Sequence, residues 1–277
     1  MVEAIEDLFI PVLVYNNKSS DSALLKRFNE PSWNNPIVRF LNSDARDVIQ
    51  RQSGVWNIQP MAARMVAALE AVNRDVPRYL SDLAIDQSGV ELATFAMHCY
   101  WTGEARLGSI DGVMNTTAGF AGGLEVVQLM YDPEEVDYST LVKTAQSFEC
   151  ASKVFTHTAA QLETAKKVAG NRAEDFPGGA RRANLSEQKY QLRTSRGVRS
   201  LPLTTYQSTK INSVIRGPNR NNALGILSPR QKGQLEKIFA LLKAGDGTEL
   251  DEFIFPEDDS ELAEYQARLN ERLESKE

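Results

Sequence analysis

Residues 93–123 read ATFAMHCYWTGEARLGSIDGVMNTTAGFAGG, and this stretch decides the fold of the central part of the chain. An apolar run over residues 90–97 predicts a strand, and the residues over 101–110 favour a helix. Cys99 therefore lies at a strand-to-helix junction. A thiol there faces free backbone N–H groups and the positive end of the helix dipole, which favour the reactive thiolate. The alternative for Cys99 is a small buried apolar residue at the end of a strand.

Two further strands and two helices follow along the chain. Residues 113–120 and 124–131 have strand character, and Ala121-Gly122-Gly123 between them is a hairpin signal. Apolar residues recur at helical spacing over 138–149, and an alanine-rich helix is expected over 158–169. The order β-α-β-β-α predicts an α+β sandwich with one antiparallel sheet.

The N-terminal part of the chain predicts a small α/β module that ends near residue 88. Its expected elements are a buried strand over 8–15, two short strands within 36–49, an amphipathic helix from Pro60 and a short helix over 78–84. The stretch Asn29-Glu30-Pro31-Ser32-Trp33-Asn34-Asn35-Pro36, with the amphipathic helix, loosely resembles part of a thioredoxin-like domain. The module has no cysteine and cannot exchange dithiols itself, so we expect a docking or scaffold role.

The C-terminal part begins with a segment over residues 171–202 that is rich in Arg, Gly, Ser and Asn. We expect this segment to lie extended over the predicted α+β sandwich. Its arginines within residues 181–199 fit either a solvated covering loop or an anion site. Helices are predicted over 203–215 and 228–244, and a solvated helix around 257–276 within an acidic tail that begins at Asp246. The predicted domains are the module 1–88, the core with its covering segment 89–202, and a helical extension 203–277.

Composition and charge exclude several classes of protein. A chain of 277 residues with 42% hydrophobic residues can build a core and is typical of a folded, soluble protein. Its formal net charge of −6 argues against nucleic acid as a main partner. No apolar run approaches the roughly 20 residues of a membrane span, and the acidic N-terminus lacks the features of a signal peptide. We expect a cytoplasmic protein without a membrane or nucleic-acid partner.

The cysteines and histidines are few. Two of each, Cys99, Cys150, His98 and His157, cannot build a disulfide scaffold or a four-thiolate zinc site. A site of two cysteines and two histidines is also not expected, because the adjacent His98 and Cys99 lack the spacing of a zinc finger. The sequence therefore predicts no metal, and what remains open is whether either thiol is reactive.

Several groups of residues follow one another in a recognisable order: His98-Cys99-Tyr100-Trp101, Gly112-Val113, Gly119-Phe120-Ala121-Gly122-Gly123, Glu125-Val126-Val127 and Tyr131-Asp132-Pro133. They resemble the peptide methionine sulfoxide reductase family of the A type, which has Gly-Cys-Phe-Trp, Gly-Val, Gly-Tyr-x-Gly-Gly, Glu-x-Val and Tyr-Asp-Pro in that order. The resemblance covers residues 90–170, and Gln188-Lys189-Tyr190 is similar to a later segment. It implies an α+β fold with a ferredoxin-like core.

The resemblance implies a role for each matched residue. Cys99 stands where the family has the nucleophile that attacks the sulfoxide sulfur, and Glu125 where it has the acid that protonates the sulfoxide oxygen. Tyr100 and Trp101 match the aromatic pair that cradles the substrate methyl group. These roles are physically coherent, because a carboxyl in an apolar site can stay protonated and an aromatic wall excludes water. A sulfoxide-containing peptide or small molecule, a thioredoxin-type reductant and no organic cofactor are implied.

Three departures from the family pattern change the expected site. His98 replaces the glycine before the nucleophile, and we expect it, with Tyr190, to line the substrate site. The loop between the glycine turn and Glu125, with the tyrosine that it carries in the family, is missing. The segment 148–155 lacks the Asp and Tyr that help to polarise the oxygen. The resulting pocket should be wider, so that a different small oxidised substrate is a further alternative.

Cys150 is the second thiol of the chain and lies within the shortened segment. After one turnover the nucleophile would be a sulfenic acid, which condenses with another thiol. Cys150 is either this resolving thiol or an ordinary cysteine at a helix end. Two functions therefore follow from the sequence: a thiol-dependent sulfoxide reductase, or a redox-sensing or interaction protein that uses a reversible Cys99–Cys150 disulfide.

Overall fold

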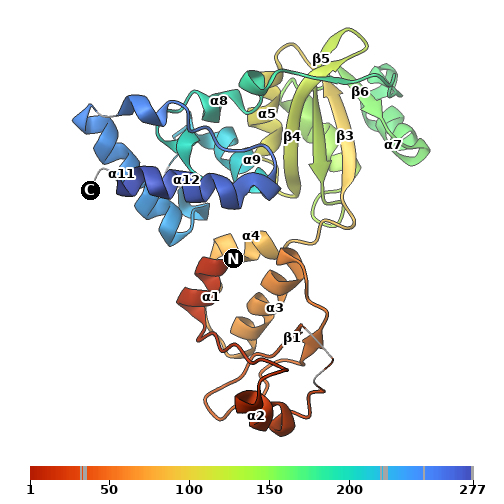
Figure 1. Ribbon diagram of the computed structural model, residues 1–277. Coiled ribbons are helices and arrows are strands. Elements are labelled where there is room, and N and C mark those ends of the chain that lie inside the picture. The colour runs from red at the N-terminus through yellow and green to blue at the C-terminus, as the bar shows by residue number, and fades with distance from the viewer. Residues whose placement is uncertain (32, 34–35, 219, 221–223, 246, 276–277) are drawn as a thin grey trace. The chain divides into compact units, whose positions relative to one another are not determined.

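A six-stranded mixed sheet forms the framework of the larger unit of the chain, Gln87–Glu277 (Figure 1). Its strands are β3 (Glu91–Ala96), β4 (Val113–Ala121), β5 (Leu124–Tyr131), β6 (Lys153–Thr156), β7 (Ala173–Asp175) and β8 (Arg181–Arg182). They stand in the order β7-β6-β3-β5-β4-β8, and every neighbouring pair is antiparallel except β6 and β7. The prediction of a purely antiparallel sheet is wrong at this edge, because a helical crossover between β6 and β7 returns the chain in the same direction.

The predicted hairpin joins β4 to β5. Ala121 pairs with Leu124, and the two residues between them, Gly122 and Gly123, have φ angles of 56° and 77°. Both angles lie in the left-handed region that glycine adopts without a steric cost, and such two-residue turns suit the twist of a hairpin. The short turn sets Glu125 at the very start of β5.

Three helices pack on one face of the sheet: α5 (Tyr100–Gly108), α6 (Tyr138–Ser147) and α7 (Ala159–Ala169). They confirm the three helices predicted for this part of the chain to within about two residues, the usual uncertainty of helix ends. The caps of α6 and α7 are the side chains of Asp137 and Thr158, which accept hydrogen bonds from the N–H groups of Thr140 and Gln161. The core between these helices and the sheet includes Phe95, Leu107, Val127, Leu129, Leu141, Val142 and Val154.

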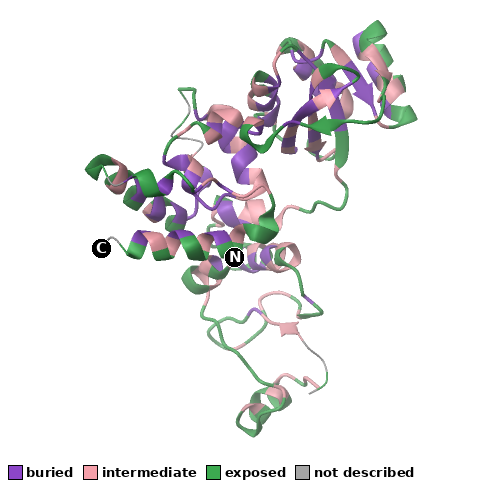
Figure 2. Ribbon diagram, turned by 45° about the horizontal axis from the view of Figure 1, so that its top comes forward, coloured by how far each residue is buried: buried purple, intermediate pink, exposed green. Residues whose placement is uncertain are grey.

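Helices α9 (Thr205–Val214), α11 (Pro229–Ala244) and α12 (Leu262–Glu274) share a second hydrophobic core in the same unit. Capping boxes at Thr204 and Ser228 begin α9 and α11, in agreement with the predicted start at Ser228-Pro229. Figure 2 shows the buried residues gathered where the helices and the sheet of this unit pack.

The last helix corrects one prediction. Tyr265, Leu269 and Leu273 recur at intervals of four residues along α12, and all three are buried in the second core. An apolar stripe of this period faces a core even when charged residues cover the rest of the helix. The helix expected around 257–276 is therefore present but is not solvated on all sides.

The segment predicted to be extended, residues 171–202, contains only short elements and covers part of the sheet. Through β8 it pairs with β4, at Gly119 and Phe120. Its other elements are η2 (Gly170–Arg172), η3 (Leu185–Glu187), α8 (Tyr190–Arg193) and η4 (Val198–Ser200). The short elements η5 (Leu224–Ile226), η6 (Gly247–Leu250) and η7 (Asp259–Glu261) lie between the later helices.

The smaller unit, Met1–Asp86, has its own core around two helices, α3 (Ile58–Ala71) and α4 (Arg78–Ala84). Both helices were predicted. The buried side chains include Phe40, Ala62, Met65, Ala68, Leu69 and Leu80. The remaining elements are α1 (Val2–Leu8), η1 (Ser19–Asp21), α2 (Ser22–Arg27), β1 (Ile37–Val38) and β2 (Gln52–Ser53).

Two predictions for the smaller unit are wrong. Residues 8–15 are not a buried strand: Leu8 ends α1, and Ile10 and Leu13 are 92% and 75% exposed. Strands β1 and β2 pair only with each other, so no described strand of this unit offers residues 8–15 a hydrogen-bonding partner. The second short strand also lies later than residues 36–49: β1 pairs with β2 at Gln52–Ser53, and across the turn around Asn42 only the isolated Leu41–Asp47 bridge has strand pairing.

The computed structural model describes residues 1–31, 33, 36–218, 220, 224–245 and 247–275. No helix in these ranges is long and apolar enough to cross a membrane. The predictions that involve Ser32, Asn34, Asn35, Asp246 and Lys276 lie outside the described residues.

Candidate active site

Cys99 is the N-cap residue of α5, directly after β3. Its backbone is extended (φ −144°, ψ 112°), and its carbonyl accepts the Gly103 N–H at 3.1 Å. A Cβ atom at Gly103 would lie 1.9 Å from Met97 Sδ and 2.9 Å from Val127 Cγ2, so glycine lets the first turn of α5 approach the sheet. The thiol is half-buried at the positive end of the helix dipole, as the sequence predicts.

Glu125 meets this helix end from the neighbouring strand. Its Oε2 accepts the backbone N–H of Tyr100 at 2.9 Å. That N–H belongs to the first turn of α5 and has no partner within the helix. The hydrogen bond fixes a carboxyl group at the residue that follows Cys99 in the chain.

Aromatic side chains form a wall beside the thiol. The Tyr100 ring contacts Trp101 and Phe120 edge-on, with centroids 6.1 Å and 5.6 Å away. Tyr190, from α8, stacks on Trp101 with the centroids 4.1 Å apart and the planes 12° from parallel. Such edge and stacked pairs stabilise one ring arrangement beyond their buried area.

Glu187 completes the site, although the sequence did not single it out. Its Oε2 accepts the Trp101 indole N–H at 3.0 Å and the Tyr100 hydroxyl at 3.3 Å. Burial raises the pKa of the Tyr100 hydroxyl, and the neighbouring acidic groups of Glu187, Glu125 and Cys99 raise it further. The only signal in the sequence was its place directly before Gln188-Lys189-Tyr190.

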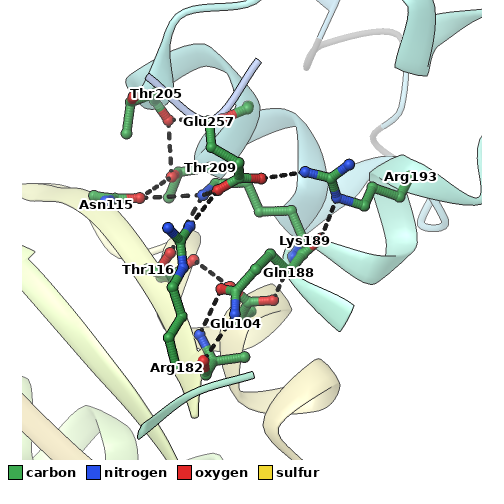
Figure 3. A network of polar contacts seen from close by, with 12 residues as sticks. Glu104, Asn115, Thr116, Arg182, Gln188, Lys189, Arg193, Thr205, Thr209 and Glu257 are labelled. Atoms are coloured by element: carbon green, nitrogen blue, oxygen red, sulfur yellow. Dashed lines mark hydrogen bonds and ion pairs between the residues drawn. The ribbon is translucent and has the colours of Figure 1, made fainter. Parts of the chain in front are cut away.

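Buried polar contacts hold the segment that carries Glu187 and Tyr190 (Figure 3). The Gln188 amide accepts the Ala118 N–H at 2.9 Å and donates to the Ala118 carbonyl at 2.8 Å, so that this side chain bonds to the backbone of β4 next to its pairing with β8. The Lys189 N–H donates to Glu104 of α5 at 2.6 Å. The segment is thereby attached to β4 and to α5, the helix that begins directly after Cys99.

Three known reductases are similar to part of this chain. The peptide methionine sulfoxide reductase MsrA of Pseudomonas syringae pv. tomato is 37% identical over 73 residues, a match that covers 20% of this chain and 34% of the relative. Peptide methionine sulfoxide reductase A5 of Arabidopsis thaliana is 32% identical over 101 residues, a match that covers 31% of this chain and 40% of the relative. MsrA of Salmonella typhimurium is 31% identical over 96 residues, which covers 28% of this chain and 42% of the relative. This chain is a relative of peptide methionine sulfoxide reductase A.

The relatives confirm the resemblance that the ordered motifs indicated. The chain spans roughly 34–42% of the length of these relatives. No family model matches it. The relationship thus rests on a part of the chain.

Of the residues that the reductase resemblance implied, the structure brings four together around Cys99. Tyr100 and Trp101 begin α5, Glu125 bonds to the Tyr100 N–H, and Tyr190 covers Trp101. His98 differs from these. It is exposed, between the buried Met97 and the half-buried Cys99, and its side chain has no hydrogen bond or ring contact within the described part of the chain.

Cys150 lies in the core near this site. It is 2% exposed, and its Sγ–H donates to the Phe148 carbonyl at 3.4 Å. Burial raises the pKa of the Cys150 thiol; the positive charge of Arg106 opposes this rise, and Cys99 adds to it. Cys150 at neutral pH is therefore a protonated thiol within the electrostatic reach of Cys99.

A cavity of about 370 Å³ lies over another part of the sheet. Thr94, Thr117, Gln128 and Arg182 are among the residues that line it, whereas Cys99 and Glu125 are not. This cavity therefore does not include Cys99 or Glu125.

Proposed function

We propose that this protein is a thiol-dependent oxidoreductase that reduces methionine sulfoxide, in a peptide or a small molecule, with Cys99 as the nucleophile. The observation that carries the proposal is the hydrogen bond from the Tyr100 N–H to Glu125, which sets a carboxyl group at the helix end that bears the thiol. The aromatic wall beside it and the reductase relatives support the same chemistry.

The reaction balances with the groups of this site. The Cys99 thiolate attacks the sulfoxide sulfur while the Glu125 carboxyl donates a proton to the sulfoxide oxygen. The hydroxyl formed in this way passes from the substrate sulfur to the Cys99 sulfur, so that the substrate sulfur–oxygen bond and the newly formed sulfur–sulfur bond both break. The substrate leaves as the thioether, and Cys99 becomes a sulfenic acid. Tyr100 and Trp101 receive the substrate methyl group by dispersion contact and keep water from the sulfur.

A second thiol regenerates the enzyme. A thiolate attacks the Cys99 sulfenic acid, a disulfide forms and water leaves. We propose Cys150 as this thiol. A dithiol reductant of the thioredoxin type then supplies two electrons and reduces the disulfide by exchange. The cytoplasm, where such reductants operate, is the proposed location.

The fold supports the proposal in its connectivity. Strands and helices follow in the order β3-α5-β4-β5-α6-β6, and the four strands stand as β6-β3-β5-β4. We infer a ferredoxin-like core from this order. The segment up to residue 202 would cover the core, residues 203–277 would extend it, and the module 1–88 would serve docking.

Single-substitution variants test the proposal. Purified wild-type protein, Cys99→Ser and Cys150→Ser are incubated with methionine sulfoxide, free and in a peptide, and a small dithiol. We expect the wild type to convert one sulfur epimer to methionine, Cys99→Ser to convert none, and Cys150→Ser to keep turnover because the small dithiol replaces Cys150. Equal conversion by wild type and Cys99→Ser would show that Cys99 is not the nucleophile.

A redox sensor is the second candidate, and the observation in its favour is a second free thiol, Cys150, within the electrostatic reach of Cys99. Peroxide would oxidise the Cys99 thiolate to a sulfenic acid, and Cys150 would close a disulfide with loss of water. Disulfide formation with peroxide in a protein that reduces no sulfoxide would favour the sensor over the reductase.

A further inference from the structure

Glu187 occupies the polar edge of the aromatic wall with one carboxylate oxygen unused. Both of its aromatic donors, Trp101 Nε1–H and the Tyr100 hydroxyl, bond to Oε2. Its Oε1 accepts no hydrogen bond from the residues that the structure describes. A carboxylate can accept about four hydrogen bonds, so Oε1 is available to a substrate that lies against the two rings.

The charged groups around the Tyr100 ring are acidic. Glu187 accepts the Tyr100 hydroxyl and Glu125 accepts the Tyr100 N–H, and both residues, with Cys99, raise the pKa of the Tyr100 hydroxyl, so the titratable groups that act on this ring are acids. A half-open site of this kind attracts positive groups and repels negative ones.

One cation lies near the wall, but it does not neutralise these acids. The Arg181 guanidinium lies over the Phe120 ring, 4.6 Å from its centroid. It forms no ion pair with Glu125 or Glu187 within the described structure. Arg181 is itself exposed, so water screens its charge.

The position of Glu187 is fixed by its neighbours in the chain. Gln188 is bound to both polar groups of Ala118, and the Lys189 N–H is bound to the buried Glu104 (Figure 3). The carboxylate is therefore held in place before a substrate arrives, and little conformational entropy is lost when a partner binds it.

We propose that Glu187 is a specificity-determining residue that selects sulfoxide substrates with a positively charged group next to the oxidised methionine. The methyl group lies against Tyr100 and Trp101, and the cation of a neighbouring lysine or arginine pairs with Oε1 of Glu187. The inference rests on the proposed sulfoxide chemistry, for which it names a substrate class.

Two peptides of equal length and composition, apart from one residue, test the inference. Each contains one methionine sulfoxide, preceded by Lys in the first peptide and by Glu in the second. We compare wild type, Glu187→Gln and the control Glu163→Gln, which removes an exposed carboxylate of α7 far from the wall in sequence. Steady-state kinetics gives kcat/KM for each peptide, and titration of the Cys99→Ser background gives the dissociation constants without turnover.

We expect the wild type and Glu163→Gln to prefer the Lys peptide by about two- to fivefold, which corresponds to one partly exposed ion pair. Glu187→Gln should reduce this ratio to about one. Its amide oxygen can still accept the Trp101 N–H, so the wall should remain in place, and unchanged tryptophan fluorescence would verify this. Added salt should reduce the wild-type ratio and leave that of Glu187→Gln unchanged.

The outcomes separate the two proposals. Equal kcat/KM for both peptides with the wild type, or an unchanged ratio in Glu187→Gln, would overturn the specificity role while sulfoxide reduction stands. If neither peptide is reduced, the proposed function fails, and the ratio of the dissociation constants still decides the selectivity. If Glu163→Gln also lost the preference for the Lys peptide, the preference would be an effect of the overall charge of the protein, and the inference would be overturned as well.

Discussion

Cys99 and Cys150 lie just past the same end of the β3–β6 ladder. Ala96 and Lys153 form the last pair of this ladder, Cys99 follows Ala96 by three residues, and Cys150 precedes Lys153 by three residues. The ladder ends where the Ser152 N–H and hydroxyl both bond to the Ala96 carbonyl, each at 2.9 Å. Two free thiols separated by 51 residues of sequence are thus brought to the same end of the sheet by strand register.

From this relationship we predict that sulfoxide turnover without an external reductant ends in a Cys99–Cys150 disulfide. Mass spectrometry of the intact protein should show the loss of two hydrogen atoms, and peptide mapping should link the two cysteines. Cys150→Ser should instead accumulate the Cys99 sulfenic acid, which a trapping diketone would label. Wild-type protein that reduces sulfoxide and keeps both thiols free would contradict the prediction.

Arg106 should govern the rate at which this disulfide closes. Burial raises the pKa of Cys150, and Arg106 opposes the rise. Since the thiolate attacks, closure should become faster as the pH increases toward the raised pKa of Cys150. Arg106→Gln removes the opposing charge and should slow closure about two- to fivefold at a given pH, the effect of a weak exposed charge. Rapid-quench measurement of free thiol over a pH series checks both effects.

Arg106→Lys is the matched control, because it keeps the positive charge. The Arg106 side chain also donates to the Phe148 carbonyl at 2.8 Å, so either variant can loosen this contact. An electrostatic role predicts closure at a wild-type rate with Lys and slower closure with Gln. Equal slowing in both variants would assign the effect to the lost hydrogen bond.

Glu104 should make the folded state less stable as the pH rises toward neutrality. It is fully buried, and burial raises its pKa from 4.5 to about 7. The folded protein therefore holds this proton more tightly than the unfolded chain, so the stabilisation is complete below pH 4.5 and is lost as the pH passes through about 7. Urea unfolding from about pH 5 to about pH 8 should show a decrease on the order of 3 kcal/mol at most from this group.

Glu104→Gln isolates this contribution. Glutamine stays neutral. Its amide oxygen can accept the Lys189 N–H, and its amide NH2 can donate to the Thr116 hydroxyl oxygen in place of the bond that the carboxyl accepts there. The free energy of unfolding of the variant should therefore change less with pH than that of the wild type. The two curves should separate between about pH 4.5 and pH 7 and run parallel above that range. Parallel curves for the two proteins over the whole range would show that another group causes the pH dependence.

Local features of the site could be predicted from the sequence because few residues determine them. The hairpin depends on two adjacent glycines, and the thiol at a helix start depends on the change from an apolar run to a helical pattern after Cys99. The position of Glu125 next to that helix follows from the hairpin, since the short turn sets it at the start of β5.

Long-range partners could not be predicted in this way. Glu187 lies 86 residues from Trp101 in an arginine-rich segment, and only the docking of that segment onto β4 and α5 brings the carboxylate to the ring. The error over residues 8–15 has a related cause. An apolar, β-branched run shows that a segment is suited to a sheet, but it does not show whether a partner strand is there.

The last prediction concerns Glu257, which connects the C-terminal part of the larger unit to the segment that carries Glu187. Its carboxylate pairs with Arg182, Arg193 and, at 3.9 Å, the 2% exposed Lys189 (Figure 3). Burial lowers the pKa of Lys189, whereas Glu257 and Glu104 raise it, so Glu257 helps to keep this buried amine charged.

Glu257→Ala should therefore destabilise the protein by about 3–5 kcal/mol, the cost of leaving a buried charge without its partner. Asp251→Ala is the control, because Asp251 is about half exposed and pairs with Arg196 and Arg199 near the surface, where the cost should be below about 1 kcal/mol. Chemical denaturation of both variants measures the difference. Equal destabilisation would mean that the Glu257 cluster is held by packing and not by charge.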